Sequence, residues 1–179
     1  MKFDLRQIYK KDAVPRMLKS FGYPNVMAVP KIEKVVVNTG IGSVKDDEQR
    51  KRVAEHLAVV TGQKVSERPA KKSISSFKIA KGSIIGYSVT LRGKRMYDFL
   101  NKLLFVALTR QRDFRGLNPD AVDEAGNLTI GLKDHLIFPE MVNEDLKSAF
   151  GLSITVVTTA ASKEKSIEFL KLMGFPFKK

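Results

Sequence analysis

The chain has 179 residues, of which 43% are hydrophobic, enough to bury the core of one compact domain and too many for an intrinsically disordered chain. Its 32 Lys and Arg residues outnumber 19 Asp and Glu, and the formal net charge of +13 is typical of nucleic-acid-binding proteins, although an anionic membrane stays open on charge alone. The absence of cysteine excludes disulfides and Cys-based zinc sites, and without a long apolar run or signal-like N-terminus we expect a soluble, cytoplasmic protein.

The first part of the chain predicts a helix, a strand and a second helix. Apolar residues at helical spacing predict a helix over 3–21, with a kink at Pro15. A β-branched run predicts a strand over 31–39. The pattern over 46–61 predicts an amphipathic helix, with acidic residues at its positive N-terminal end and Gly62 at its stop.

A basic loop over 69–83 separates two strand-like runs, 63–68 and 84–92. Its lysines have no acidic residue among them, so they need counterions or a polyanion. They are Lys71, Lys72, Lys78 and Lys81. A solvated surface loop is the simpler reading, but the global positive charge and Phe77 among the lysines favour contact with RNA. Phe77 could instead hold the loop against the core.

The second part of the chain predicts a helix over 94–109, strands over 128–133 and 152–159, and a last helix over 163–173. The whole order is βαββαββα, and the direct loop makes the second and third strands an antiparallel pair. We therefore predict an α+β fold: a single domain over 1–179, with a mostly antiparallel five-stranded sheet and helices on one face.

Polar and basic side chains occupy the strand positions opposite the apolar stripe. These are Asn38, Ser88, Thr90, Arg92, Thr129 and Lys133. Such positions can bind a partner without emptying the core, so the second face of the sheet is predicted to be an open, RNA-binding face. By pattern alone, Asn38 and Thr90 read equally well as ordinary solvent-facing residues.

Two other classes of function are weaker. Gly40-Ile41-Gly42 follows a strand and precedes a helix, as in a dinucleotide-binding turn, but Lys45 stands where a third glycine is needed. His56 and His135 lack a clustered carboxylate or cysteine and read as surface or boundary residues. We predict no enzyme, no catalytic residue, no metal and no cofactor. The N-terminal helix contains a proline and two aspartates, so we also predict no membrane binding.

The sequence resembles the bacterial large-subunit ribosomal protein five family, which binds 5S ribosomal RNA. The similar stretches follow the family's order along nearly the whole chain. They are Pro30–Asn38, Thr61–Lys64, Ala70–Ile74, Val89–Gly93, Arg95–Tyr97, Arg112–Gly116, Ile137–Glu140 and Val156–Ala160. Each is weak alone, and together they are far more specific than one short motif.

The resemblance implies a non-catalytic protein of the central protuberance of the large ribosomal subunit, with 5S rRNA, 23S rRNA and peptidyl-site tRNA as partners. The family's polar contacts to 5S rRNA match Asn38, Gln63 and Thr90. We add to this predicted interface Lys31, Lys34, Ser88 and Arg92. The loop Lys71–Gly82 matches the segment that reaches the tRNA elbow, with contacts expected from Lys71, Lys72, Ser73, Phe77, Lys78 and Lys81. Another surface is expected to meet a small-subunit head protein, forming an intersubunit bridge.

The chain departs from the family pattern at several places. Pro69 stands where a small or basic residue is usual, and Thr109 replaces a proline, which would let the preceding helix extend. The segments 122–126 and 141–150 are only loosely similar, so no contacts are carried onto them. The basic run Arg110, Arg112 and Arg115 reads either as phosphate-binding or as a network with Asp113.

Overall fold

The computed structural model describes residues 4–42, 44, 46–77, 79–111, 114–142 and 149–178. Four residues singled out from the sequence lie outside this part of the chain: Lys45, Lys78, Arg112 and Asp113. Most of the loosely similar segment 141–150 lies outside it as well.

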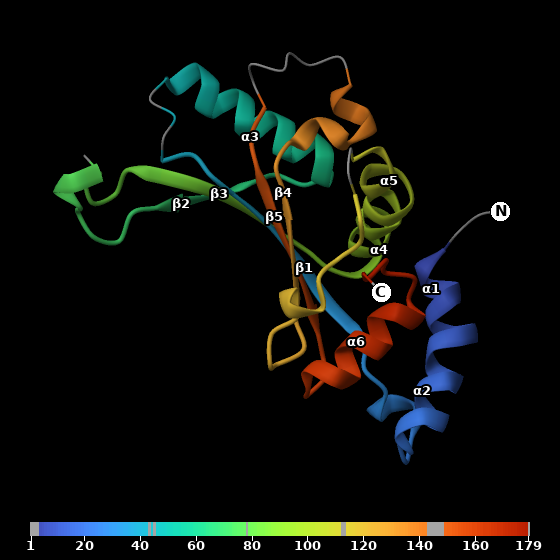
Figure 1. The fold of residues 1–179 in the computed structure, drawn as a ribbon. Helices are drawn as coiled ribbons and strands as arrows, with labels where there is room; N and C mark the ends of the chain where they lie inside the picture. Colours follow the sequence, from blue (N-terminus) through green and yellow to red (C-terminus); the bar gives the residue numbers. More distant parts are fainter. Residues whose placement is uncertain are drawn as a thin grey trace. The chain divides into compact units, whose positions relative to one another are not determined.

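Five strands form one sheet in the order β2-β3-β1-β5-β4 (Figure 1). The strands are β1 Ile32–Gly40, β2 Ser66–Pro69, β3 Ile84–Leu91, β4 Leu128–Leu132 and β5 Leu152–Thr158. Strands β2 and β3 are antiparallel, as the direct loop between them predicts. The predicted α+β class with a mostly antiparallel five-stranded sheet is therefore confirmed.

The chain divides into two compact units. The first comprises residues 1–35, 92–130 and 155–179, and the second comprises residues 36–91 and 131–154. Each is described by itself below. The prediction of one domain over 1–179 stays a prediction.

In the first unit, the predicted N-terminal helix is interrupted by a wider turn. Helix α1, Leu5–Ile8, runs through a π-helical turn, Tyr9–Ala13, into α2, Val14–Phe21. Pro15 cannot donate a backbone hydrogen bond, and its ring crowds the carbonyl four residues earlier, so the wider turn before it is expected. The predicted kink at Pro15 thus takes the form of a local change in helical pitch.

Three more helical segments complete the first unit. Helix α4, Gly93–Lys102, passes through a π-helical turn, Leu103–Ala107, into the short α5, Leu108–Arg110. Helix α6, Lys163–Leu172, has Ser162 as its N-cap, as predicted. The Tyr9 ring meets the fully buried Phe169 ring edge-on, with 6.1 Å between centroids, so the N-terminal helix and α6 share a core.

The second unit contains helix α3, Asp47–Thr61, packed against β3 and against the short 3₁₀ turn Pro139–Met141. Asp46 caps the helix by accepting from the backbone N–H of Glu48 at 3.1 Å. Gly62 ends it in the left-handed region at φ +67°. The predicted stripe of Val53, Leu57 and Val60 is buried.

Strand β2 begins at Ser66, three residues later than predicted. The Thr61 hydroxyl, which donates to the Leu57 carbonyl at 2.7 Å, also lies 3.3 Å from the Gln63 carbonyl. These bonds hold Gln63 at the end of the helix. The strand ends at Pro69, where the register with β3 shifts. Proline has no N–H to donate to a neighbouring strand, so it is tolerated at an irregular position of this kind.

Strands β4 and β5 each bury alternate side chains. Leu128, Ile130 and Leu132 are buried in β4, whereas Thr129 is exposed. In β5 every second residue from Leu152 to Thr158 is buried and those between are half-buried. A strand with period-two burial has one face packed and one face in contact with solvent.

Candidate nucleic-acid interface

The second unit carries three polar residues assigned to RNA, and the structure places them differently. Asn38 is exposed between the buried Val37 and Thr39 of β1, so its amide is free to contact a partner. Thr90 of β3 and Gln63 are half-buried, and they are joined because Gln63 Nε2 donates to the Thr90 carbonyl at 3.2 Å. Gln63 therefore uses one amide hydrogen in the bond to Thr90. Its other amide hydrogen and its side-chain carbonyl oxygen can bond a partner.

Ser88 was expected on the exposed face, and this expectation is wrong. Its exposed fraction is 5%. Strand β3 lies between β2 and β1 in the sheet, and Ser88 is paired directly with Ser66. An interior strand does not by itself account for this burial, since Asn38 is exposed on β1, which is also an interior strand.

The first unit carries the basic residues of the prediction. Lys31 is exposed, and its backbone is fixed by Thr159: the Lys31 N–H donates to the Thr159 hydroxyl, and its carbonyl accepts the Thr159 N–H, both at 3.0 Å. Lys34 is half-buried. Arg92 Nη1 lies 3.3 Å from Glu33 Oε1 in an exposed ion pair. Such a pair contributes little in water, so a phosphate can compete for Arg92.

Two threonines on neighbouring strands extend the polar positions of the first unit. The hydroxyl oxygens of Thr129 on β4 and Thr155 on β5 lie 3.2 Å apart. Thr129 is exposed, as the alternating pattern predicts, and Thr155 is half-buried. Together these hydroxyls can donate to phosphate oxygens, and they can both donate to and accept from ribose hydroxyls. Lys133, which was also predicted on this face, is exposed just beyond β4 in the second unit.

The basic loop, residues 69–83, is a hydrogen-bonded extension of the β2–β3 hairpin. Ala70 is buried at its base, where its N–H donates to the Ser83 carbonyl at 2.8 Å and its carbonyl accepts the Gly82 N–H at 2.9 Å. Farther out, Ile74 and Ile79 exchange backbone bonds of 2.9 and 3.1 Å. Backbone pairing at both levels makes this a projecting arm with a defined shape.

The tip of this loop is a 3₁₀ turn, Ser75–Phe77. The Phe77 side chain is 73% exposed, so the alternative that it holds the loop to the core is wrong. Lys71, Lys72 and Lys81 are exposed, and no described acidic side chain forms an ion pair with any of them. Ser73 is exposed as well, and its hydroxyl donates to the Ile79 carbonyl at 3.1 Å. The arm presents an aromatic ring among uncompensated positive charges.

The helix before the basic run continues through Thr109 to Arg110. The Thr109 hydroxyl donates to the Val106 carbonyl at 2.8 Å, which proline could not do. Arg110 and Arg115 are exposed, and neither forms an ion pair with a described residue. Whether the run pairs with Asp113 or binds phosphate stays a prediction.

A pair formed by the buried His135 and the half-buried His56 in the second unit was missed by the sequence reasoning. His135 is 0% exposed, not a surface or boundary residue. Its Nδ1 accepts the Phe150 N–H at 3.4 Å, and its Nε2 lies 3.1 Å from Nδ1 of His56. The Phe150 ring stacks on His135 at 3.9 Å between centroids. The one available signal was the apolar run that follows, Leu136-Ile137-Phe138.

This environment keeps His135 neutral. Burial, followed by the neighbouring His56, lowers the pKa of His135 from 6.5 to about 4, and Asp134 opposes the shift. With Nδ1 accepting from the backbone, the ring proton sits on Nε2 and is donated to His56. The pair is thus a structural hydrogen bond between the buried His135 and the half-buried His56.

Two further searches cover the described residues only. Across these ranges, no group of three or more His, Cys, Asp or Glu residues is placed to hold a metal ion. Within the same part of the chain, no helix has both the length and the hydropathy needed to cross a bilayer.

Comparison with known proteins covers nearly the whole chain. Residues 25–79 match the family described as "Ribosomal protein L5", and residues 84–177 match "ribosomal L5P family C-terminus". Proteins named "Large ribosomal subunit protein uL5" from Alkaliphilus oremlandii and Thermus thermophilus are 48% and 49% identical over 176 residues. The match covers 98% of this chain in both cases, and 98% and 97% of the respective relatives. The chain belongs to the ribosomal protein L5 family.

Proposed function

We propose that the chain is a structural constituent of the large subunit of the cytoplasmic ribosome. In this role it binds 5S rRNA and helps attach it to 23S rRNA in the central protuberance. Relatives of almost equal length carry the name of a large-subunit protein, which supports this assignment. The single structural observation behind it is the exposed polar side chain at strand positions between buried neighbours, of which Asn38 is the clearest case.

The contacts divide by chemistry. Lys31, Lys34 and Arg92 supply positive charge for phosphates, which gives affinity without reading sequence. Asn38 and Gln63 supply amide groups that both donate and accept, so they can read base edges or the ribose 2′-hydroxyl. The Thr90 hydroxyl can serve the same purpose. Ser88 is removed from this set because it is buried.

We further propose that the basic loop contacts the elbow of peptidyl-site tRNA. It is hydrogen-bonded at two levels and carries Phe77 at its tip, which suits stacking on exposed bases. The exposed Lys71, Lys72 and Lys81 suit the phosphates of the same RNA, and Lys78 is proposed to join them. A bridge to a small-subunit head protein is also proposed, on the family resemblance alone.

Selective RNA binding is the direct test of the proposed function. The purified chain is titrated with 5S rRNA, with an unrelated structured RNA of equal length and with anionic vesicles across a salt series. We expect binding to 5S rRNA that exceeds binding to the other two at every salt concentration. Equal affinity for both RNAs would show that binding is only nonspecific attraction of charges. Stronger binding to the vesicles would favour a membrane-surface protein over the proposed function.

The role of the loop is tested separately from that of the strands. Substituting both Lys71 and Lys72 with alanine should weaken tRNA-dependent ribosome function and leave 5S rRNA capture nearly unchanged. The matched control is Lys51→Ala, an exposed lysine on α3. If the double variant loses 5S capture as strongly as a strand variant does, the division between the two surfaces is wrong.

A further inference from the structure

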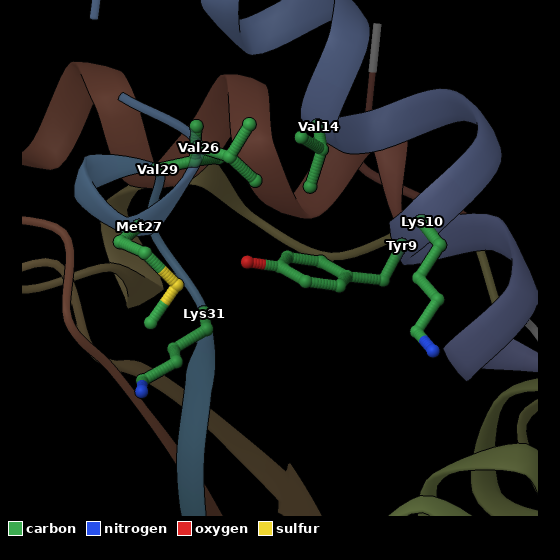
Figure 2. Close-up of a pocket in the computed structure, with 7 residues that line it drawn as sticks. All are labelled: Tyr9, Lys10, Val14, Val26, Met27, Val29 and Lys31. Atoms are coloured by element: carbon green, nitrogen blue, oxygen red, sulfur yellow. The ribbon is translucent and has the colours of Figure 1, made fainter. Parts of the chain in front are cut away.

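The first unit has a surface hollow that the proposed contacts leave unused (Figure 2). It measures about 310 Å³ and is formed by the N-terminal helix and the segment leading into β1. Its lining residues are Tyr9, Lys10, Val14, Val26, Met27, Val29 and Lys31. A volume near the lower end of the range of roughly 300–1,000 Å³ for ligand pockets suits one flat ring system rather than a large ligand.

Two apolar residues of the lining are open to solvent, whereas Val14 and Val29 are buried. Met27 is 82% exposed and Val26 is 52% exposed, on the turn Val26–Ala28. Asn25 fixes this turn by accepting from the Met27 N–H at 3.2 Å, so the Met27 side chain is presented by a defined backbone. An exposed thioether beside other apolar groups is costly in water and typical of a surface that a partner covers.

Tyr9 forms the opposite wall. The edge-on packing of its ring against Phe169 holds it in place, and burial raises the pKa of its hydroxyl. Figure 2 shows the ring reaching from the helix toward the turn that carries Met27, with the hydroxyl at its leading end. No described residue forms a hydrogen bond with this hydroxyl, which leaves it available to a base edge or a 2′-hydroxyl.

The positive charge around the hollow indicates which kind of partner it can bind. Lys10 and Lys31 are exposed members of the lining, and the lining contains no acidic residue. Neither lysine forms an ion pair with a described residue. A partner must therefore combine an apolar flat surface with nearby negative charge, which is the chemistry of an unpaired nucleotide.

We propose that this hollow binds one unstacked nucleotide of ribosomal RNA, with its base between Met27 and Tyr9 and its phosphates near Lys10 and Lys31. This inference rests on the proposed function and adds to it a contact site outside the polar strand positions. The nucleotide belongs either to 5S rRNA or to 23S rRNA, since both offer the same chemistry.

Photo-cross-linking of the full chain tests the site. Benzoylphenylalanine replaces Met27 in one variant and, as a control, Val59 in another, a 55% exposed residue on α3. Each variant is irradiated with 5S rRNA alone and with 5S and 23S rRNA together. We expect the residue at 27 to cross-link to one unpaired nucleotide, and the two arms to identify its source. Cross-links to many nucleotides, or none beyond the Val59 control, would overturn the proposal.

Binding measurements separate stacking from charge. Met27→Ser should weaken binding to the cross-linked RNA at least about tenfold, because it removes the apolar surface that the base would cover, and should leave the salt slope unchanged. Lys10→Gln should reduce the salt slope by about 0.7, and the control Lys51→Gln should not. Unchanged affinity for Met27→Ser would overturn the proposed nucleotide site. The proposed function would still stand in that case, provided that the wild type binds 5S rRNA. Failure of wild-type binding itself would instead count against the proposed function.

Discussion

Acidification should destabilise the fold through His135. This side chain is fully buried, and burial together with His56 lowers its pKa from 6.5 to about 4. In the unfolded chain the same side chain gains a proton near pH 6.5, so between these two values the unfolded state binds more protons than the folded state. The contribution of His135 to stability is therefore complete above about pH 6.5 and is lost as the pH falls toward 4.

The size of this effect follows from the shift. A pKa difference of about 2.5 corresponds to at most about 3 kcal/mol of unfolding free energy, at 1.36 kcal/mol for each unit. That is a large fraction of the stability of a typical domain, about 5–15 kcal/mol. Other titrating groups change stability over the same range, so the measurement must isolate His135.

Urea unfolding at pH 7.5 and pH 4.5 provides this isolation when the wild type is compared with His135→Gln. Glutamine does not titrate, and its packing cost is present at both pH values and cancels. We expect the wild type to lose about 2 kcal/mol more than the variant between the two pH values. His56→Gln should reduce this loss, because it removes the neighbour that helps to depress the pKa of His135. Equal losses in the wild type and His135→Gln would refute the reasoning.

Four further substitutions test packing at Gly126, with Gly131 of β4 as the control, and capping at Ser162. Gly126→Ala should destabilise the fold by at least about 2 kcal/mol, because Gly126 has φ +85° and an added Cβ would lie 2.7 Å from the Ala160 carbonyl oxygen. Gly131→Ala, with nothing within 4 Å, is the matched control and should change the unfolding free energy by no more than about 0.5 kcal/mol. Ser162→Ala should cost about 1 kcal/mol by removing the N-cap of α6, whereas Ser162→Asp should restore it; failure of Asp to do so would exclude capping as the cause. Thermal or urea unfolding measures all four.

The elements were predictable because local pattern and burial agree along most of the chain. The alternation in β4 and the capping of α6 by Ser162 depend on neighbours in sequence, and both are observed. The late start of β2 was not predictable, because it depends on how Thr61 and Gln63 hydrogen-bond at the end of α3. Periodicity indicates which face a side chain occupies but carries no information about such local competition.

The candidate interface was predictable in part, for the same reason. Asn38 is exposed as its strand position indicates, but Ser88 is buried although it also occupies a position opposite the apolar stripe, so alternation along the strand does not by itself give exposure. The burial of His135 depends on contacts with Phe150, which lies fifteen residues away in the sequence. The spacing of these two residues does not predict that they are in contact. Similarly, the exposure of Met27 beside Tyr9 appears only when the N-terminal helix and the turn before β1 meet.

The central claim is that exposed polar side chains of the strands bind 5S rRNA, and the affinity of Asn38→Leu for 5S rRNA tests it most directly. Asn38 is exposed, so leucine should leave the unfolding free energy nearly unchanged while removing the amide. We expect binding to weaken by about tenfold or more, with Gln49→Leu, an exposed position on α3, binding as the wild type does. Wild-type affinity in Asn38→Leu, with the fold intact, would contradict the account.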